Sequence, residues 1–473
     1  MKYISTRGEA PALEFDDVLL AGLARDGGLY VPETYPELSS AEIAAMAGKS
    51  FADIAETVIA PFVGETIDRG ALSQILHTAY SAPEPFHHQA ITPLVQVGRN
   101  TFVLELFHGP TLAFKDVAMQ VLARLMDHVL AKRTQTAMIV GATSGDTGGA
   151  AIEAFRKSSR ARMMILYPQG RVSDVQRRMM TTPTEKSVST LAVDGTFDDC
   201  QALVKAMFAD HDFRDRVALS GVNSINWARI VAQVTYYFVA AVALGAPRRK
   251  VSFAVPTGNF GDIFAGYVAK RMGLPIETLV IASNDNDILP RTTTTGVYEK
   301  RGVVATTSPS MDIQVSSNFE RWLFEAQGRD AALVRSQMSS LQQSGAFEVQ
   351  GGSSVVQADF HAGAASEAEV AKVVETALSA SGYLVEPHTA CALKVVSDLT
   401  ATKACDPSVP MVVLATAHPA KFPEAMARIT GRATPLPSRL SHLMSEPEVT
   451  QPIANDLAAI KAAVEAMAHN TTR

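Results

Sequence analysis

The feature that most constrains the fold is a regular alternation of strand-like and helix-like segments that begins near residue 91. Short apolar runs alternate with longer runs whose apolar residues recur at helical spacing. This alternation predicts an α/β fold of open, mostly parallel sheets with helices on both faces. The expected strands are 101–106, 136–140, 162–167, 188–193, 251–255, 277–282 and 411–415, and the expected helices are 115–131, 149–158, 172–181, 198–209, 225–243, 263–272 and 421–429.

Two parts of the chain depart from this alternation. Residues 1–90 are predicted to form a small, mostly helical N-terminal domain, and residues 91–473 an α/β region of two lobes. Within that region, residues 283–365 are less regular and are expected to form a smaller lobe or a cover over the site. The other expected elements are helices 38–47, 51–62, 71–80 and 366–380, a strand at 383–386 and a terminal helix at 451–473.

Four polar residues follow shortly after predicted strands: Lys115, Ser144, Asn259 and Thr416. In open parallel sheets, ligands bind beyond the carboxyl ends of the strands. We therefore expect these four residues to converge on one site.

Lys115 lies in the stretch FHGPTLAFKDVAM, residues 107–119, between a predicted strand and a long amphipathic helix. Apolar neighbours remove water from a lysine amine when the segment packs, which lowers its pKa and favours nucleophilic chemistry such as imine formation. Taken alone, a lysine at a helix start is more often a surface residue whose stem covers apolar side chains. Two further stretches favour the reactive interpretation.

The first of these stretches is PTGNFGD, residues 256–262, which joins a predicted strand to a predicted helix. Gly258 and Gly261 would let backbone N–H groups converge on an anion at the helix N-terminus, by allowing an unusual φ angle or a close approach. A phosphate would fit there, although the spacing matches neither nucleotide motif. Asp262 is a poor neighbour for a phosphate and is expected to cap the helix or bind a side chain. An ordinary turn is the alternative.

The second stretch is GATSGDTGG, residues 141–149, which also joins a predicted strand to a predicted helix. It supplies open backbone and the small hydroxyl groups of Ser144 and Thr147. Such a turn suits a carboxylate or phosphate that approaches the main chain closely. The alternative is a tight turn without a ligand.

Composition and charge exclude several classes of protein. The 42 basic and 48 acidic residues leave a net charge of -6, and no basic stripe with interleaved aromatic residues occurs, so nucleic acid is not an expected partner. The longest apolar stretch, 234–246, is shorter than the roughly 20 residues that a membrane span requires. No secretory signal is expected. These observations predict a soluble, cytoplasmic protein.

Cysteine and histidine spacing predicts no metal site. The 3 cysteines lack C-x-x-C spacing, so neither a disulfide framework nor a zinc site is indicated. His108, His388 and His418 lack metal-ligand spacing and are predicted to be core residues or residues behind the site.

These stretches, together with SINWARI at 224–230 and ATAHPAKF at 415–422, resemble the bacterial and fungal branch of the threonine synthase family. The resemblance extends from MKYISTRGE at the start through DGGLYVPE at 26–33, and so covers nearly the whole chain. It implies a fold-type II pyridoxal-phosphate enzyme that converts O-phospho-L-homoserine and water into L-threonine and phosphate. A monomer or homodimer is expected.

The resemblance also implies roles for individual residues. Lys115 would hold the cofactor and move protons as a general base and acid, and Thr416 would face the pyridine nitrogen. The cofactor phosphate would bind at Gly258, Asn259, Phe260, Gly261 and Asp262. The residues expected to bind substrate are Ser144, Asp146, Thr147, Asn226 and Arg229.

Three of these assignments have alternatives. Asp146 stands where related enzymes commonly carry asparagine near the phenolic oxygen of the cofactor, which puts that contact in doubt. Arg229 could bind the substrate phosphate through two nitrogens or pair with a surface carboxylate. The hydroxyl of Thr416 could instead cap the following helix.

Two other functions remain open at this stage. One is a different fold-type II lyase, such as a serine or threonine dehydratase or an O-acetylserine-type synthase, which needs no second anion site. The other is a catalytically silent metabolite-binding protein on the same scaffold, which the presence of Lys115 disfavours.

Overall fold

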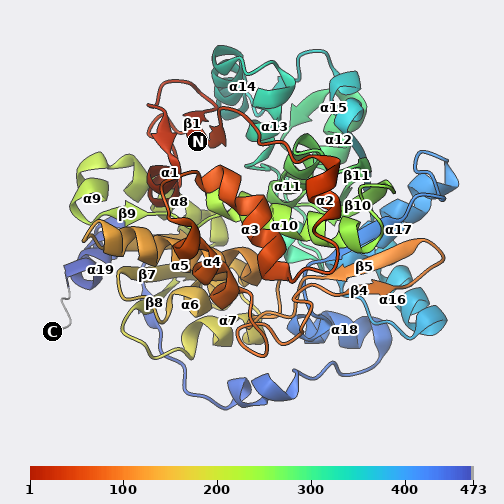
Figure 1. Ribbon diagram of the computed structural model, residues 1–473. Helices are drawn as coiled ribbons and strands as arrows, with labels where there is room; N and C mark the ends of the chain where they lie inside the picture. The colour runs from red at the N-terminus through yellow and green to blue at the C-terminus, as the bar shows by residue number, and fades with distance from the viewer. Residues whose placement is uncertain (470–473) are drawn as a thin grey trace.

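The computed structural model describes residues 1–469, and two mainly parallel sheets organise them (Figure 1). One sheet contains β4 Leu94–Gln96, β5 Thr101–Glu105, β10 Val251–Pro256, β11 Ile276–Ser283, β14 Phe360–Ala364 and β15 Met411–Ala415. The other contains β6 Ala137–Ala142, β7 Ala161–Pro168, β8 Val188–Val193, β9 Leu219–Ser220 and β16 Gln451–Ile453. Their strand orders are β14-β11-β10-β15-β5-β4 and β16-β8-β7-β6-β9. Every neighbouring pair is parallel except β4 with β5, which confirms the predicted mostly parallel architecture.

The sequence did not reveal how the strands divide between the sheets. The consecutive strands β5 and β6 lie in different sheets, which occupy opposite sides of the view in Figure 1. The predicted strands and helices of residues 91–282 form to within a few residues of their expected bounds. The helices of this region are α5 Lys115–Lys132, α6 Asp146–Phe155, α7 Asp174–Thr181, α8 Phe197–Ala209, α9 His211–Arg216, α10 Trp227–Ala243 and α11 Gly261–Arg271.

The central strand β10 shows why its segment folds as a buried strand. All of its side chains are buried, so the run is continuously apolar rather than alternating, as expected for a strand covered on both faces. The helix α10 crosses the interior and is buried over most of its length. These two elements place the turns that follow β10 and precede α10 in the interior.

The N-terminal region contains a sheet that the helical prediction missed. Its three predicted helices form, and two of them begin with capping boxes, at Ser39 with Glu42 and at Ser50 with Asp53. Its strands are only two to four residues long and pair antiparallel, which is too short for a periodic signal. The elements are β1 Lys2–Ser5, β2 Leu13–Glu14, α1 Phe15–Ala21, β3 Tyr30–Pro32, α2 Ser40–Ala44, α3 Phe51–Val63 and α4 Arg69–Ala79.

This region shares its hydrophobic core with the rest of the chain. Tyr3 packs its ring 5.8 Å from that of Trp227 in α10, and its hydroxyl donates a hydrogen bond to Phe62 O at 2.7 Å. Tyr3 and Trp227 belong to the same hydrophobic cluster, which also contains the buried faces of α5 and α10. The domain boundary near residue 90 therefore stays a proposal.

Residues 283–365 are more regular than predicted. They form α12 Ile288–Thr295, β12 Val297–Glu299, the 3-10 helix η1 Pro309–Met311, α13 Phe319–Ala326, α14 Ala331–Gln343, β13 Ala346–Glu348 and α15 Ser353–Asp359. The strands β12 and β13 make a separate antiparallel pair. Except for the 13-residue α14, these elements have eight residues or fewer, which is too few for a clear periodic signal.

The C-terminal part differs from the prediction in two places. No strand forms at 383–386, all of which the structure describes; this segment instead leads to a helix that begins at Pro387, with Glu386 as its N-cap. The expected helix at 451–473 is a strand followed by a shorter helix, and 470–473 lie outside the described residues. The elements are α16 Glu367–Ser381, α17 Pro387–Ala401, η2 Pro419–Lys421, α18 Pro423–Thr430, η3 Ser438–Met444 and α19 Leu457–His469.

Candidate active site

A cavity of about 700 Å³ lies beyond the carboxyl ends of strands from both sheets. Lys115, Ser144, Asn259 and Thr416 all line it, which confirms that the four strand-end residues converge. Part of the segment 303–317 forms another wall. Of the two alternatives predicted for residues 283–365, a smaller lobe or a cover over the site, this position agrees with the cover.

Lys115 is the first residue of α5, and its side chain is only 11% exposed. The interpretation as a surface lysine is therefore wrong. Burial lowers the pKa of its amine, and the nearby positive charges of Lys421 and Arg229 add to this effect. The carboxylate of Asp146, 3.5 Å away, acts in the opposite direction. The net result is an amine that loses its proton more readily than an exposed lysine.

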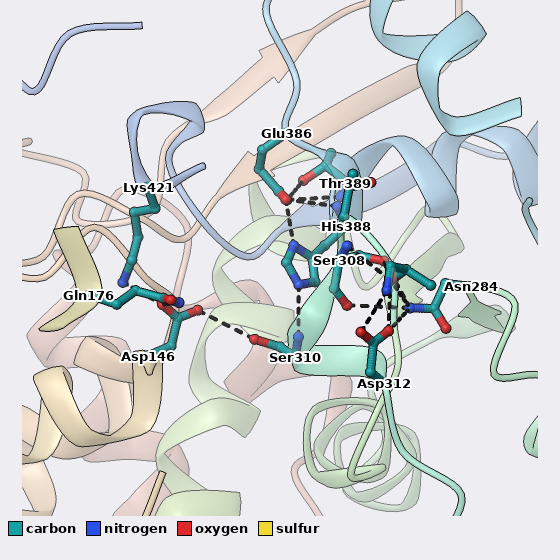
Figure 2. A network of polar contacts seen from close by, with 12 residues as sticks. Asp146, Gln176, Asn284, Ser308, Ser310, Asp312, Glu386, His388, Thr389 and Lys421 are labelled. Carbon is teal, nitrogen blue, oxygen red and sulfur yellow. Dashed lines mark hydrogen bonds and ion pairs between the residues drawn. The ribbon is translucent and has the colours of Figure 1, made fainter. Parts of the chain in front are cut away.

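Asp146 begins α6 and carries the carboxylate that faces Lys115. Its Oδ1 lies 2.6 Å from Lys421 Nζ and accepts a hydrogen bond from Gln176 Nε2 at 2.8 Å. Figure 2 shows this group at one end of a longer polar network. Burial alone would raise the pKa of Asp146, but the charges of Lys421 and Lys115 hold it well below its usual range.

Lys421 was missed as a candidate. It belongs to the quoted string ATAHPAKF, but a lysine in a 3-10 helix gives no sequence signal for burial. In the structure its side chain is 1% exposed. Its amine is bound by Asp146 and by Thr111 O, the latter at 2.8 Å.

The turn at 256–262 lines the cavity, but its glycines do not act through their φ angles. The positive φ of this turn, +62°, belongs to Phe260, whose ring packs 5.4 Å from that of Phe319. Gly258 is required for close approach, because a Cβ there would lie 2.6 Å from Ser310 O. Gly261 is less constrained, since its nearest neighbour would be Asn318 Nδ2 at 3.3 Å.

Asp262 binds side chains rather than an anion. Its Oδ1 accepts hydrogen bonds from the hydroxyls of Tyr236 at 2.5 Å and Tyr237 at 3.0 Å. Of the two roles predicted for Asp262, helix cap or partner of a side chain, the structure confirms the second. Burial raises the pKa of Asp262 to about 6, although the two tyrosines act against this.

The string SINWARI contains two predicted site residues, Asn226 and Arg229, and only Arg229 lines the cavity. Arg229 lines the cavity and is buried, and burial lowers its pKa to about 10. Its Nη1 donates to Val222 O at 3.4 Å, whereas its Nε has no hydrogen-bond partner among the described residues. The alternative prediction, that Arg229 pairs with a surface carboxylate, is therefore wrong. A buried guanidinium with an unused donor fits an anionic ligand.

Asn226 has a structural position instead. It caps α10 by accepting a hydrogen bond from Ala228 N at 3.0 Å, and its amide group donates to Leu19 O and Gly221 O. It does not line the cavity; Asn223, three residues earlier, does. The prediction of Asn226 as a substrate contact is corrected on this basis, because its side chain is fully used within the protein.

The three hydroxyl residues predicted for the site all line the cavity: Ser144, Thr147 and Thr416. The alternative role of Thr416 as a helix cap is wrong, because His418 caps η2 by accepting from Ala420 N at 3.1 Å. The main chain of Thr416 accepts a hydrogen bond from Phe114 N at 2.8 Å. This bond ties the end of β15 to the residue before Lys115.

His388 is a further cavity residue that sequence reasoning assigned to the core or to a position behind the site. It is buried, as expected, and its Nδ1 lies 2.6 Å from Glu386 Oε2. Its Nε2 accepts a hydrogen bond from Ser310 N at 3.3 Å, as Figure 2 shows. The sequence signal was PHTA at the start of a helix, which does not reveal which wall of the cavity the ring of His388 reaches.

Within residues 1–469, no group of three or more potential metal ligands occurs.

Known proteins resemble this chain over nearly its whole length. Residues 2–80 match the family model described as threonine synthase N terminus, residues 86–342 that of pyridoxal-phosphate dependent enzymes, and residues 389–464 that of the threonine synthase C-terminal region. The chain is 48% identical to a threonine synthase of Pseudomonas aeruginosa, over 98% of both chains. The chain belongs to the threonine synthase family. It is also 42% identical to a threonine synthase of Saccharomyces cerevisiae, over 90% of this chain and 88% of that one.

A solved structure supports the same conclusion. The PLP-bound threonine synthase from Brucella melitensis is 56% identical, with a TM-score of 0.94, and the match covers 99% of this chain and 100% of that chain. The fold-type II assignment and pyridoxal phosphate as cofactor are thereby confirmed. The comparisons support the threonine synthase family and not the dehydratase or silent binding protein that the sequence left open.

The cavity residues fit pyridoxal phosphate by their own chemistry. Lys115 offers a buried amine of lowered pKa, which suits a covalent bond to the aldehyde carbon of the cofactor. The turn before α11 brings main chain to the cavity wall at Thr257, Gly258 and Asn259, at the N-terminus of an 11-residue helix. Such a turn suits the cofactor phosphate. The volume of about 700 Å³ leaves room for substrate as well.

Proposed function

We propose that this chain converts O-phospho-L-homoserine and water into L-threonine and phosphate, with Lys115 as its catalytic lysine. The observation that supports this assignment is the position of Lys115, a buried amine in a cavity lined by all the predicted strand-end residues. A silent binding protein would not need such an amine, because keeping it buried costs solvation.

Pyridoxal phosphate, when bound, stabilises negative charge that develops on the substrate carbons next to the amino group. The protein supplies the remaining requirements. The Nζ of Lys115 takes a proton from the substrate as a general base and returns it as a general acid, and its lowered pKa makes the free amine more available for the first task.

Two anions have to be held in this reaction, the cofactor phosphate and the substrate phosphate. We assign the first to the turn that contains Gly258 and Gly261, at the helix N-terminus. Arg229 is our candidate for an anionic group of the substrate, because it is buried, lines the cavity and has a free Nε donor among the described residues. Ser144 and Thr147 offer hydroxyls on the same wall.

Thr416 and His388 complete the proposed assignment. Thr416 offers a neutral hydroxyl toward the cofactor ring, so no carboxylate favours a protonated ring nitrogen at that position. His388 orients the covering segment, because its Nε2 accepts the hydrogen bond of Ser310 N while Glu386 fixes its Nδ1. This covering segment forms part of the cavity wall beside the proposed substrate site.

The test is an assay of phosphate release and threonine formation from O-phospho-L-homoserine, with serine, threonine and O-acetylserine as competing substrates. We expect turnover of O-phospho-L-homoserine far above the others. Reduction of the loaded enzyme with borohydride should fix the cofactor on the peptide that contains Lys115. Phosphate release without threonine, or a label on Lys421, would contradict the proposal.

Two broader properties belong to the same proposal. No helix in residues 1–469 is long and apolar enough to cross a membrane. Cys200, Cys391 and Cys405 are unpaired and buried. The unpaired cysteines agree with our placement of the chain in the reducing cytoplasm. We also propose a monomer or homodimer, which light scattering in solution would test.

A further inference from the structure

The cavity region contains a second buried amine that the proposed reaction does not use. Lys421, in η2, has a side chain that is 1% exposed and does not line the cavity. Its Nζ lies 2.6 Å from Asp146 Oδ1 and donates to Thr111 O at 2.8 Å. Burying a lysine is costly unless its charge is paired, so this position requires a physical explanation.

The two oxygens of Asp146 have different surroundings. Oδ1 is engaged by Lys421 at 2.6 Å and by Gln176 at 2.8 Å, whereas Oδ2 faces Lys115 and Ser310 Oγ, each at 3.5 Å. Figure 2 shows Lys421 and Gln176 on one side of Asp146 and Ser310 on the other. The strong contacts of this carboxylate therefore point away from the catalytic amine.

We propose that Lys421 is a positioning residue that neutralises Asp146 from behind, so that Lys115 reaches its substrates as a free amine rather than as the partner of a buried carboxylate. This inference rests on the proposed function of Lys115. It explains how an aspartate can stand beside the catalytic lysine without holding its proton.

The charges around the two lysines support this arrangement. Besides Asp146, the charged groups that act on Lys115 are Lys421 and Arg229, which lower its pKa, and Lys115 in turn acts on Asp262. Lys421 acts on Asp146 and, more weakly, on the buried Asp116. Without Lys421, Asp146 would keep one nearby cation, Lys115, and the attraction between opposite charges in a poorly solvated site would stabilise the protonated amine.

A purely structural role for Lys421 predicts something different. Its hydrogen bond to Thr111 O ties η2 to the segment just before α5. If that tie were its whole purpose, a neutral residue that still donates to Thr111 O would leave the chemistry of Lys115 unchanged. Lys421→Gln removes the charge and keeps a side-chain donor for Thr111 O, whereas Lys421→Met removes both the charge and the donor.

The experiment measures the protonation of Lys115 directly, in the full chain without cofactor. A brief pulse of acetic anhydride at each pH, followed by mass spectrometry of the peptide that contains Lys115, gives the pH at which the amine is half reactive. We expect both Lys421→Met and Lys421→Gln to raise this midpoint by about one pH unit or more. In the loaded enzyme, the pH dependence of kcat, which reports groups in the enzyme–substrate complex where the amine of Lys115 is free, should move in the same direction.

The matched control is Lys461→Met. Lys461 pairs with Asp210 at 2.5 Å, and neither residue lines the cavity, so its loss should leave the midpoint unchanged. A second variant, Lys421→Met combined with Asp146→Asn, removes both charges and should bring the midpoint back to the wild-type value or below it, because Asp146 raises the pKa of Lys115. It also replaces the single variants if they do not fold, since it leaves neither Asp146 nor Lys421 as an unpaired charge; a midpoint above that of wild type would then contradict the proposal.

Two other results would overturn the inference. A midpoint unchanged in Lys421→Met would show that Lys421 does not act on Lys115, and a rise in Lys421→Met but not in Lys421→Gln would make its role structural. Because the labelling needs neither cofactor nor substrate, its outcome is independent of the assay for threonine formation. Failure of the inference is thus distinguishable from failure of the proposed function.

Discussion

The turns at 141–149 and 256–262 look alike in sequence and differ in electrostatics. Each follows a buried strand, β6 or β10, and leads directly into a helix. Each places an aspartate in the first turn of that helix, Asp146 in α6 and Asp262 in α11, and each aspartate is buried beside the cavity. Local sequence alone would assign them the same role.

The pKa values of the two aspartates are shifted in opposite directions. Asp146 meets two lysine amines, which hold its pKa well below the usual range against the effect of burial. Asp262 meets two tyrosine hydroxyls, which cannot offset burial, so its pKa rises to about 6. The comparison teaches that a strand, glycine turn and aspartate define a position for a carboxyl group, whereas distant elements decide how readily that group takes up a proton.

The largest effect is expected where Asp146 meets the catalytic amine. Lys115→Ala should lower turnover by at least about a thousandfold, because Lys205, the other lysine that lines the cavity, is exposed and not part of the buried group around Asp146. The visible absorbance of the bound cofactor should be lost in parallel. Turnover and absorbance spectra measure both, with Lys394→Ala, a surface residue paired with Glu369 and Asp398, as the control. Substantial activity in Lys115→Ala would break the comparison, since Asp146 would then face no catalytic group.

The second prediction compares the two aspartates at pH 7. Asp146→Asn should lower the free energy of unfolding by about 3 kcal/mol, because it leaves the buried Lys421 without its counter-charge. Asp262→Asn should change it by no more than about 1 kcal/mol, because the tyrosines can still donate to the amide oxygen. Urea unfolding of both variants measures the difference. Equal losses would mean that the partners do not distinguish the two sites.

The third prediction concerns the glycines of the second turn. Gly258→Ala should raise the dissociation constant of pyridoxal phosphate at least about tenfold, a change of about 1.4 kcal/mol. A Cβ at this position would lie 2.6 Å from Ser310 O, and main chain cannot move aside as a side chain can. Gly261→Ala is the matched control and should have a smaller effect, since its Cβ would meet only Asn318 Nδ2 closely, at 3.3 Å. A stronger effect at Gly261 would contradict this account.

The smallest effect is expected on acidification from pH 7 to pH 5. The pKa of Asp262 is raised to about 6 in the folded state, so the folded protein takes up a proton in this range that the unfolded chain does not. Wild type should therefore gain about 1 kcal/mol of stability relative to Asp262→Asn over this interval. The depressed pKa of Asp146 gives the opposite sign, and its contribution declines only below about pH 4, the value of an unfolded aspartate.

Measurement of unfolding at several pH values tests this last pair. The stability difference between wild type and Asp146→Asn should stay constant from pH 7 to pH 5, while the difference between wild type and Asp262→Asn changes. If both differences remain constant over that interval, Asp262 is not held in the environment described here.

Several features of the protein were determined by the sequence itself. Alternating apolar periods predicted the parallel strands and covering helices, because side-chain burial repeats with the geometry of each element. The placement of Lys115, Ser144, Asn259 and Thr416 after strands predicted their convergence on one cavity. The first inference depends only on the period of each element, and the second on the general rule that parallel strands end at the same edge of a sheet.

Other features were decided only by the tertiary structure. The division of β5 and β6 between two sheets and the positive φ of Phe260 depend on packing against distant segments. The charge of each aspartate does as well: Lys421 lies 275 residues beyond Asp146 and the two tyrosines belong to α10, before Asp262. Electrostatic free energy depends on distances between side chains in space, which a linear pattern does not contain.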